Sequence, residues 1–352
     1  MNCISIHCVV PRAGSVLVLV LIVLSSMIIL SVGLTYRTQI EMRLAYANAE
    51  RTQSYYLALG GIERAKALLS EQKLSPLRVA RVCRFAATAR EERLFEQLED
   101  FDPDAGRFLM FSLRDEKGYL NLNRSDPASW TDIDCVGEEL SSAILDWIDG
   151  DHDVGPGGAE TDFYEGLAPP YISKDAPVVA LKELLLIKGV TRDTYVGEDL
   201  NRNSSLDETE RDGRLRLPFD NEDSKLDVGL LDTFTVYGNG RLNINTTGGA
   251  ILRALPGLDD EAAEHLLIYR AGPDGQEGTE DDGFFASGED FAKVEGLTEL
   301  QVELLRQYCC FDSDHFRVFS CAGLNNTFKC CLMATIKYTE SQPQILYLER
   351  LL

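Results

Sequence analysis

The sequence predicts an α+β protein in which a long N-terminal apolar helix packs on a small antiparallel sheet, with a large, mostly α-helical segment inserted between the strands. Three observations lead to this expectation. Residues 15–34 are mainly apolar. Residues 107–123 and 312–352 contain runs in which apolar and polar residues alternate, as they do in strands. The residues between these two regions carry helix signals instead.

The composition is that of a folded, acidic protein. Of 352 residues, 45% are hydrophobic and 26% are charged, which is enough apolar material for a core. The formal net charge is −23, and this charge repels phosphate backbones and favours cations or basic partners. Nucleic acid is therefore disfavoured as a ligand.

The N-terminal segment has the length of a membrane-spanning helix. No charged residue occurs from Ala13 to Tyr36, and Ser15 to Leu34 would form a helix of about 30 Å. A secretory signal has a shorter apolar core with its cleavage site after it. Here the candidate cleavage site, Gly14 followed by Ser15, comes before the apolar stretch. The alternative is a plain signal anchor.

Beyond the apolar stretch, residues 37–69 keep the spacing of an amphipathic helix. The pair Gly60-Gly61 weakens this helix by about 1 kcal/mol per glycine, so we expect a bend or close packing there. Lys117-Gly118 predicts the turn of a hairpin over residues 107–123, and residues 315–322, 327–338 and 344–351 read as strands.

These signals divide the chain into five parts. Residues 1–14 form a leader and residues 15–70 the N-terminal helix. Residues 71–123 begin the α/β domain, residues 124–311 form the inserted, mainly helical domain, and residues 312–352 supply the C-terminal strands.

The inserted segment contains an internal repeat. Residues 180–191, 251–259 and 291–298 share a helix end, a glycine, an apolar residue and a helix N-cap. Each resembles a helix-hairpin-helix turn, whose amides often bind DNA phosphates. Because Asp259, Asp260 and Glu261 would face any phosphate there, we expect structural helix packing instead.

One acidic loop has the ligand spacing of an EF-hand. Calcium takes six to eight hard oxygen ligands, and oxygen-bearing residues occupy loop positions 1, 3, 5, 7, 9 and 12 here. Ser204 stands where glycine is usual, and no clear helix pair flanks the loop. The alternative is a solvated acidic loop. The predicted ligands are Asp199, Asn201, Asn203, the Ser205 carbonyl, Asp207 and Glu210.

A second acidic cluster surrounds the turn Gly155-Pro156-Gly157-Gly158. Its carboxylates repel one another when unpaired, and a second calcium ion could hold the loop together. Surface acidity is the alternative. The predicted ligands, which follow Asp146 in the chain, are Asp149, Asp151, Asp153, Glu160 and Asp162.

Signals of catalysis are weak. The four histidines are scattered without HExxH spacing, and no GxSxG, P-loop or GxGxxG motif stands out. Paired carboxylates could perform acid/base chemistry only in a cleft that perturbs their pKa values. We therefore expect no enzyme activity.

The nine cysteines match no ordinary zinc pattern. Two vicinal pairs, Cys309-Cys310 and Cys330-Cys331, flank Cys321. An oxidising compartment would permit a bridge from Cys321 to Cys330 or Cys331, but we favour buried strand residues over a disulfide framework.

The N-terminus resembles that of type IV pilin-like proteins: a short leader, a glycine before the cut, an apolar helix and an amphipathic extension. Most such subunits carry a glutamate where this chain has Leu19. In the family that carboxylate neutralises the terminal ammonium of the subunit above, because a bare charge in hydrocarbon is costly. A subunit with none above it does not need the carboxylate.

Nearly the whole chain resembles the general secretion pathway protein K family, the large minor pseudopilins of type II secretion. The residues that carry the resemblance, besides the N-terminus, are Leu120–Asn123, Ala143–Asp149, Gly157–Glu160, Pro169-Pro170-Tyr171 and Asn243–Thr246.

The resemblance implies a subunit that caps the pseudopilus tip and starts its assembly in a complex with other minor pseudopilins. It also implies cleavage by the prepilin peptidase, methylation at Ser15, contact with the inner-membrane secretion platform, and a single-pass inner-membrane protein with its main domain in the periplasm. Family members bind Ca2+ in the inserted domain. The alternatives are a membrane-tethered calcium- or DNA-binding receptor with helix-hairpin-helix motifs, and a hydrolase.

Overall fold

The structure is a computed structural model that describes residues 13–71, 107–131, 133, 135–198, 227–277, 279, 281–324, 327–338 and 343–351. The chain divides into two compact units, Met1–Gln53 and Ser54–Leu352. The first helix, α1 (Ala13–Glu71), begins in the first unit and ends in the second.

In the first unit, α1 exposes its apolar side chains from Val16 onward. By length and composition it could cross a membrane, and it is the one such helix among the described residues. The hydroxyls of Ser25, Ser26 and Thr35 each donate a hydrogen bond to the backbone carbonyl four residues earlier. These bonds satisfy polar groups that would otherwise be costly in hydrocarbon.

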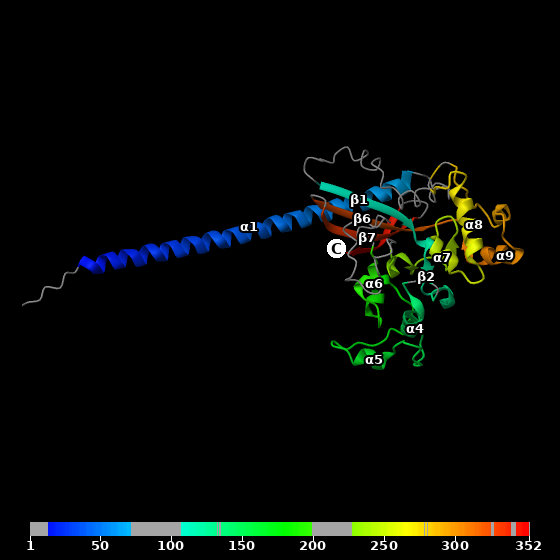
Figure 1. Ribbon diagram of the computed structural model, residues 1–352, viewed down its shortest axis with the longest axis horizontal. Coiled ribbons are helices and arrows are strands. Elements are labelled where there is room, and N and C mark those ends of the chain that lie inside the picture. Colours follow the sequence, from blue (N-terminus) through cyan, green and yellow to red (C-terminus); the bar gives the residue numbers. More distant parts are fainter. Residues whose placement is uncertain are drawn as a thin grey trace, which may run out of the picture. The chain divides into compact units, whose positions relative to one another are not determined.

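The second unit contains a four-stranded antiparallel sheet in the order β1-β6-β7-β8. Figure 1 shows β1, β6 and β7 side by side. The C-terminal strands that the alternation predicts are present. The strands are β1 (Arg107–Asp115), β6 (His315–Leu324), β7 (Thr327–Tyr338) and β8 (Pro343–Arg350).

The last turns of α1 pack on one face of this sheet. Ala58, Ile62 and Ala65 are fully buried in a cluster with side chains of β1, β6 and β7. A Cβ atom on Gly61 would lie 2.2 Å from Ser320 Oγ. Because α1 is continuous through the glycine pair, close packing rather than a bend explains Gly61. The mixed α+β fold expected from the sequence is confirmed.

The predicted hairpin over residues 107–123 is wrong. β1 pairs with β6, whereas β2 (Leu120–Asn121) pairs in parallel with β3 (Phe234–Thr235). The cause is a 3-10 turn, η2 (Glu116–Gly118), at the end of β1. There the Asp115 carboxylate accepts hydrogen bonds from the Asn243 and Thr246 side chains, which turns the chain away from the sheet.

Residues 116–314 lie between the neighbouring strands β1 and β6. Their described side chains form most of a larger apolar core, which Phe319 of β6 and Met333 of β7 join. Trp130, Trp147, Tyr164 and Phe285 are among its buried side chains. The elements are η3 (Pro127–Ser129), α4 (Gly137–Ile148), α5 (Thr161–Glu165), η4 (Leu181–Leu186), α6 (Arg192–Val196), η6 (Leu230–Asp232), β4 (Leu242–Asn243), α7 (Gly249–Arg253), α8 (Asp260–Ala271), η7 (Asp290–Lys293), α9 (Glu299–Tyr308) and β5 (Cys309–Cys310).

A turn between two helical segments occurs at each of the three predicted repeats, and we call each a helix–turn–helix repeat. Each turn contains a glycine with positive φ, followed two residues later by an N-cap whose side chain accepts a backbone N–H bond. The left-handed conformation explains why glycine stands there. The glycine and N-cap pairs are Gly189 and Thr191, Gly257 and Asp259, and Gly296 and Thr298.

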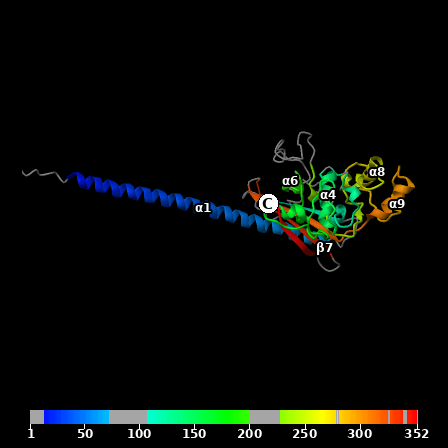
Figure 2. The same ribbon diagram turned by 90° about the horizontal axis from the view of Figure 1, so that it is seen from below.

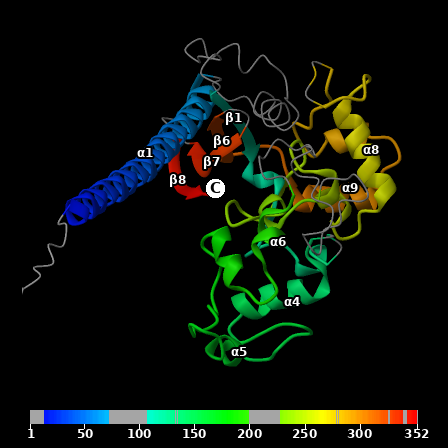
Figure 3. The same cartoon turned by 60° about the vertical axis from the view of Figure 1, so that its left-hand side comes forward.

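The second and third helix–turn–helix repeats pack against each other reciprocally. All three views show α8 beside α9 (Figures 2 and 3). A Cβ atom on Gly257 would lie 2.6 Å from Leu304 of α9, and one on Gly296 would lie 2.3 Å from His265 of α8. His265 and Leu304 hold the same place, because each is the sixth residue of its helix. These two helix–turn–helix repeats therefore form a pseudo-symmetric pair.

The cysteines that the structure describes are of two kinds, disulfide-bonded and free. A disulfide joins Cys321 to Cys331, which lie opposite each other on β6 and β7. The interpretation of these two as unpaired strand residues is thus wrong. Cys309, Cys310 and Cys330 are free and buried, as that interpretation predicted.

Candidate functional site

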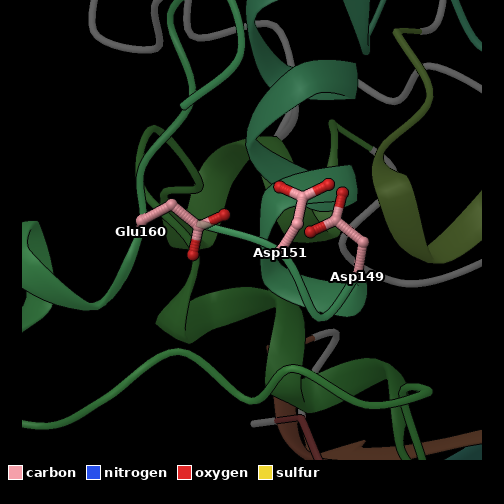
Figure 4. Close-up of side chains that lie close together, drawn as sticks. All are labelled: Asp149, Asp151 and Glu160. Carbon is pink, nitrogen blue, oxygen red and sulfur yellow. The ribbon is translucent and has the colours of Figure 1, made fainter. Parts of the chain in front are cut away.

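The candidate site in the second unit is a cluster of three carboxylates (Figure 4). Oxygen atoms of Asp149, Asp151 and Glu160 all lie within 4.8 Å of one another. Asp149 and Asp151 come from the loop that follows α4, and Glu160 directly precedes α5. No other group of three or more metal-ligating side chains occurs among the residues that the structure describes.

The loop that carries the cluster is held by a fourth acid, Asp146. This side chain is buried in the last turn of α4 and accepts hydrogen bonds from the Gly155 N–H at 3.1 and 3.3 Å. A Cβ atom on Gly158 would lie 2.0 Å from the Asp146 carboxylate. The glycines of the turn therefore allow the backbone to close over Asp146 and bring Glu160 back to α4.

Glu160 is the unusual member of the cluster. Its side chain is buried, with the residue 5% exposed, yet neither carboxylate oxygen has a hydrogen-bond partner. Burial raises the pKa of Glu160, and the nearby carboxylates of Asp146, Asp149 and Asp175 raise it further. Burying a charge without a partner is costly, so this carboxylate needs either a proton or a cation.

Asp149 also has a raised pKa, although its side chain is exposed rather than buried. Partial desolvation raises its pKa most, followed by the charges of Asp151, Asp146 and Asp175. A bound divalent cation would reverse these effects, because its charge favours the ionised form of each carboxylate. With only hard oxygen donors present, the cluster fits Ca2+ or Mg2+ rather than a soft metal.

Aromatic side chains pack together on the elements next to the cluster. The rings of Trp147 and Tyr164 lie 5.1 Å apart, and Tyr171 stacks on Tyr164 at 5.2 Å. Behind the turn, Lys188 Nζ donates to the Gly158 carbonyl at 2.9 Å and lies 5.2 Å from the Phe163 ring centroid. These contacts fix both ends of the loop.

Sequence reasoning proposed five ligands for this cluster, and the structure gathers three of them. Asp153 is exposed and its N–H donates to the Asp151 side chain. Asp162 is exposed in the first turn of α5. Asp175, which influences both Glu160 and Asp149, was missed. Its positive φ of 48° is a backbone property with no clear sequence signal.

The EF-hand-like loop, Asp199 to Glu210, lies outside the described residues. Its flanks are described. Gly197 and Val228 form an antiparallel bridge, and the Glu198 carboxylate accepts a hydrogen bond from the Asp227 N–H at 2.9 Å. The residues that precede and follow this segment are therefore next to each other in the fold.

Two further predictions concern the N-terminus and the hairpins. Gly14 and Ser15 lie in the first turn of α1, and the leader before Ala13 is outside the described part of the chain. At the hairpins, Asp259, Asp260 and Glu295 are exposed. Their charges disfavour phosphate binding there.

Comparison with known proteins points to one family. Residues 133–197, which include the acidic cluster, match the family model described as Type II secretion system (T2SS), protein K. Type II secretion system protein K of Aeromonas hydrophila is 27% identical over 212 residues, which cover 52% of this chain and 61% of the relative. That of Pseudomonas aeruginosa is 25% identical over 330 residues, which cover 89% and 85%.

A solved structure is also similar. It is the crystal structure of the GspK-GspI-GspJ complex from the enterotoxigenic Escherichia coli type 2 secretion system. One chain matches with a TM-score of 0.46 and 16% identity, over 86% of this chain and 99% of that one. The resemblance to type II secretion system protein K that the sequence predicted is confirmed by the family model and the relatives.

Proposed function

We propose that this chain is a minor pseudopilin of the type II secretion protein K family, which caps the pseudopilus tip and starts its assembly in a complex with other minor pseudopilins. The match to a protein K over most of both chains carries this proposal. The proposed role is structural rather than catalytic, and it places α1 in the inner membrane with the main domain in the periplasm.

Two features of the chain support a place at the tip. Leu19 stands where most pilin-like subunits have a glutamate, so this chain lacks the carboxylate that would neutralise the terminal ammonium of a subunit above it. Between β1 and β6 the chain also carries the large inserted segment, residues 116–314. Such a segment would hinder the addition of another subunit above.

Processing of the N-terminus is the direct test. The proposed pathway requires the prepilin peptidase to cut after Gly14 and Ser15 to be N-methylated. Intact mass and N-terminal sequencing of the membrane-extracted protein should therefore show methylated Ser15 as the first residue. A protein that keeps its leader would instead be a membrane-tethered receptor, and the pseudopilin proposal would be wrong.

Assembly gives an independent test. The chain, co-expressed with the two minor pseudopilins of its own secretion system, should purify with both of them in one complex. Leu19→Glu should leave that complex intact, because the residue lies in the membrane segment and its role concerns a subunit that is absent at the tip. Failure of the wild-type chain to purify with either protein would contradict the proposal.

We further propose that Asp149, Asp151 and Glu160 bind one Ca2+ ion, with Asp199, Asn201, Asn203, Ser205, Asp207 and Glu210 as a second site. The orphaned, buried Glu160 carboxylate is the observation that supports the first site. When bound, the ion supplies positive charge that neutralises the cluster. The protein's own groups position the ligands: Asp146 and Lys188 hold the loop in place through their hydrogen bonds to Gly155 and Gly158.

A further inference from the structure

We propose that the outer edge of β8 binds an extended segment of another protein, in which apolar and acidic residues alternate, by adding it as a fifth strand. β8 is the last strand of the sheet, and no strand among the described residues pairs with its outer side. The inference rests on this edge alone and does not depend on the proposed function.

The register shows which backbone groups are available. The Leu351 N–H donates to the Cys331 carbonyl at 2.9 Å, so Leu351 forms a hydrogen-bonded pair with β7. In an antiparallel ladder such pairs alternate with pairs whose N–H and C=O point outward. Leu348, which lies opposite Ala334, is therefore of the outward type. It presents a donor and an acceptor to a further strand.

One face of the edge is apolar as far as Leu348 and incompletely covered, and the exposed Arg350, opposite the buried Leu332, ends it. Leu348 lies on the same face as its neighbour Ala334, which is fully buried in the cluster that includes α1. Leu348 itself is 40% exposed, and Ile345 and Leu346 are 37% and 45% exposed. An added strand with apolar side chains on this face would extend the buried cluster.

The other face carries two basic side chains, Lys182 and Arg192, and Lys182 is paired with an acid. Lys182 of η4 forms an ion pair with Glu349 at 2.9 Å while half of its side chain stays exposed. Arg192 of α6 donates to the Leu351 carbonyl at 2.9 Å. Glu349 is the single acid among the described residues of β8, and it is buried. Around this edge the bases Lys182, Arg192 and Arg350 outnumber the acids Glu183 and Glu349, although the chain as a whole has 57 acids and 34 bases.

The side chains on these two faces indicate which sequence pattern a strand bound at this edge should have. A strand on the edge meets apolar surface with every second side chain and the Lys182 ammonium with the others, so it should alternate apolar and acidic residues. A second copy of β8 fits less well, because it would bring the Lys182 and Arg192 charges of the two copies close together. The occupant is therefore a strand of a different protein, with acidic side chains.

The test uses the full chain in zwitterionic lipid nanodiscs and two fluorescent peptides, in which valine alternates either with glutamate or with lysine. Fluorescence anisotropy should show binding of the glutamate peptide at least about tenfold tighter than the lysine peptide. Leu348→Pro removes the outward N–H and should weaken glutamate-peptide binding at least about tenfold. The matched control, Leu348→Ala, keeps that N–H and should weaken binding less than about threefold.

Tryptophan fluorescence during urea unfolding checks that the Leu348→Pro variant is folded. If it is not, Lys182→Gln replaces it, with an expected loss of about threefold or more for the glutamate peptide alone. Equal binding of both peptides, or unchanged binding to Leu348→Pro, would overturn the proposal. So would light scattering that shows a dimer of the wild type and a monomer of the Leu348→Pro variant, because the occupant would then be a second copy.

Discussion

Arg317 and Glu116 form an ion pair that is wholly buried: the Arg317 Nη2 and Glu116 Oε2 atoms lie 2.6 Å apart, and Nε lies 3.0 Å from Oε1. The two residues are far apart in sequence, on β6 and η2. The hydroxyls of Thr235 and Thr335 also donate to the Glu116 carboxylate. Arg317 in turn donates to the Phe234 carbonyl and lies over the Tyr119 ring at 4.5 Å. The pair thus joins the sheet to the inserted segment.

Glu116→Gln should lower the free energy of unfolding of the second unit by about 3 kcal/mol, because it leaves the Arg317 charge buried without its partner. Both tryptophans, Trp130 and Trp147, lie in this unit, so their fluorescence during urea unfolding measures the change. The control is Glu63→Gln, which removes a surface pair with Lys66 in which the Glu63 side chain is 56% exposed, and it should cost less than about 0.5 kcal/mol. Equal effects would show that burial of the pair contributes nothing.

Glu160→Gln should have opposite effects on the calcium-bound and calcium-free proteins. It should weaken Ca2+ binding at the three-carboxylate cluster at least about tenfold, because it removes a charged ligand there and leaves the second proposed site unchanged. Without calcium it should stabilise the protein by about 1 kcal/mol, since it replaces an unpaired buried carboxylate with a neutral amide. Isothermal titration with Ca2+ and urea unfolding in EDTA measure the two effects.

Asp162→Asn is the matched control for this variant. Asp162 is a nearby acid of the same segment, but it is exposed and lies outside the cluster. Its replacement should leave Ca2+ affinity within about threefold of wild type. A loss as large as that of Glu160→Gln would mean that the whole acidic surface, rather than the three-carboxylate cluster, attracts the ion.

The strands and helices that depend on local patterns could be predicted from the sequence, whereas pairings over long distances could not. Alternation in residues 315–351 predicted β6, β7 and β8, and the apolar run predicted α1. The hairpin after β1 was wrong because Asp115 finds partners on Asn243 and Thr246, more than a hundred residues away. Nothing in the local sequence signals those bonds.

The candidate cation cluster shows the same limit. Acid spacing drew attention to the loop but could not separate Glu160 from Asp162, two residues later. Their different fates depend on the turn over Asp146, which directs Glu160 inward. Asp175 joins the electrostatic environment from a separate loop, and only the three-dimensional structure brings it there.

The stability of the calcium-free protein should rise as the pH falls from about 7.5 to about 5. The pKa values of Glu160 and Asp149 are raised in the folded state, chiefly by desolvation, so the folded protein binds protons that the unfolded chain does not. This contribution is fully present below the unfolded pKa values and decreases as the pH rises through the folded ones. Urea unfolding in EDTA across this range measures it, and Glu160→Gln should flatten the profile.

With saturating calcium, the stability of the protein should fall, rather than rise, as the pH is lowered. Protons and Ca2+ compete for the same carboxylates, so Ca2+ affinity should fall as the pH is lowered over the same range. Isothermal titration at several pH values checks this expectation. A Ca2+ affinity that does not change with pH would show that the ion binds elsewhere in the protein.

Gly158→Ala should both destabilise the protein and weaken calcium binding. The new Cβ would lie 2.0 Å from Asp146 Oδ2, so the turn must move away from α4, at a cost of about 1–3 kcal/mol. Gly150→Ala is the control, because a Cβ there meets no atom within 4 Å. Urea unfolding and calcium titration of both variants measure the two effects. If Gly158→Ala lost stability but kept full Ca2+ affinity, the position of Glu160 would not depend on the turn over Asp146, and this account of how the cluster is held together would be wrong.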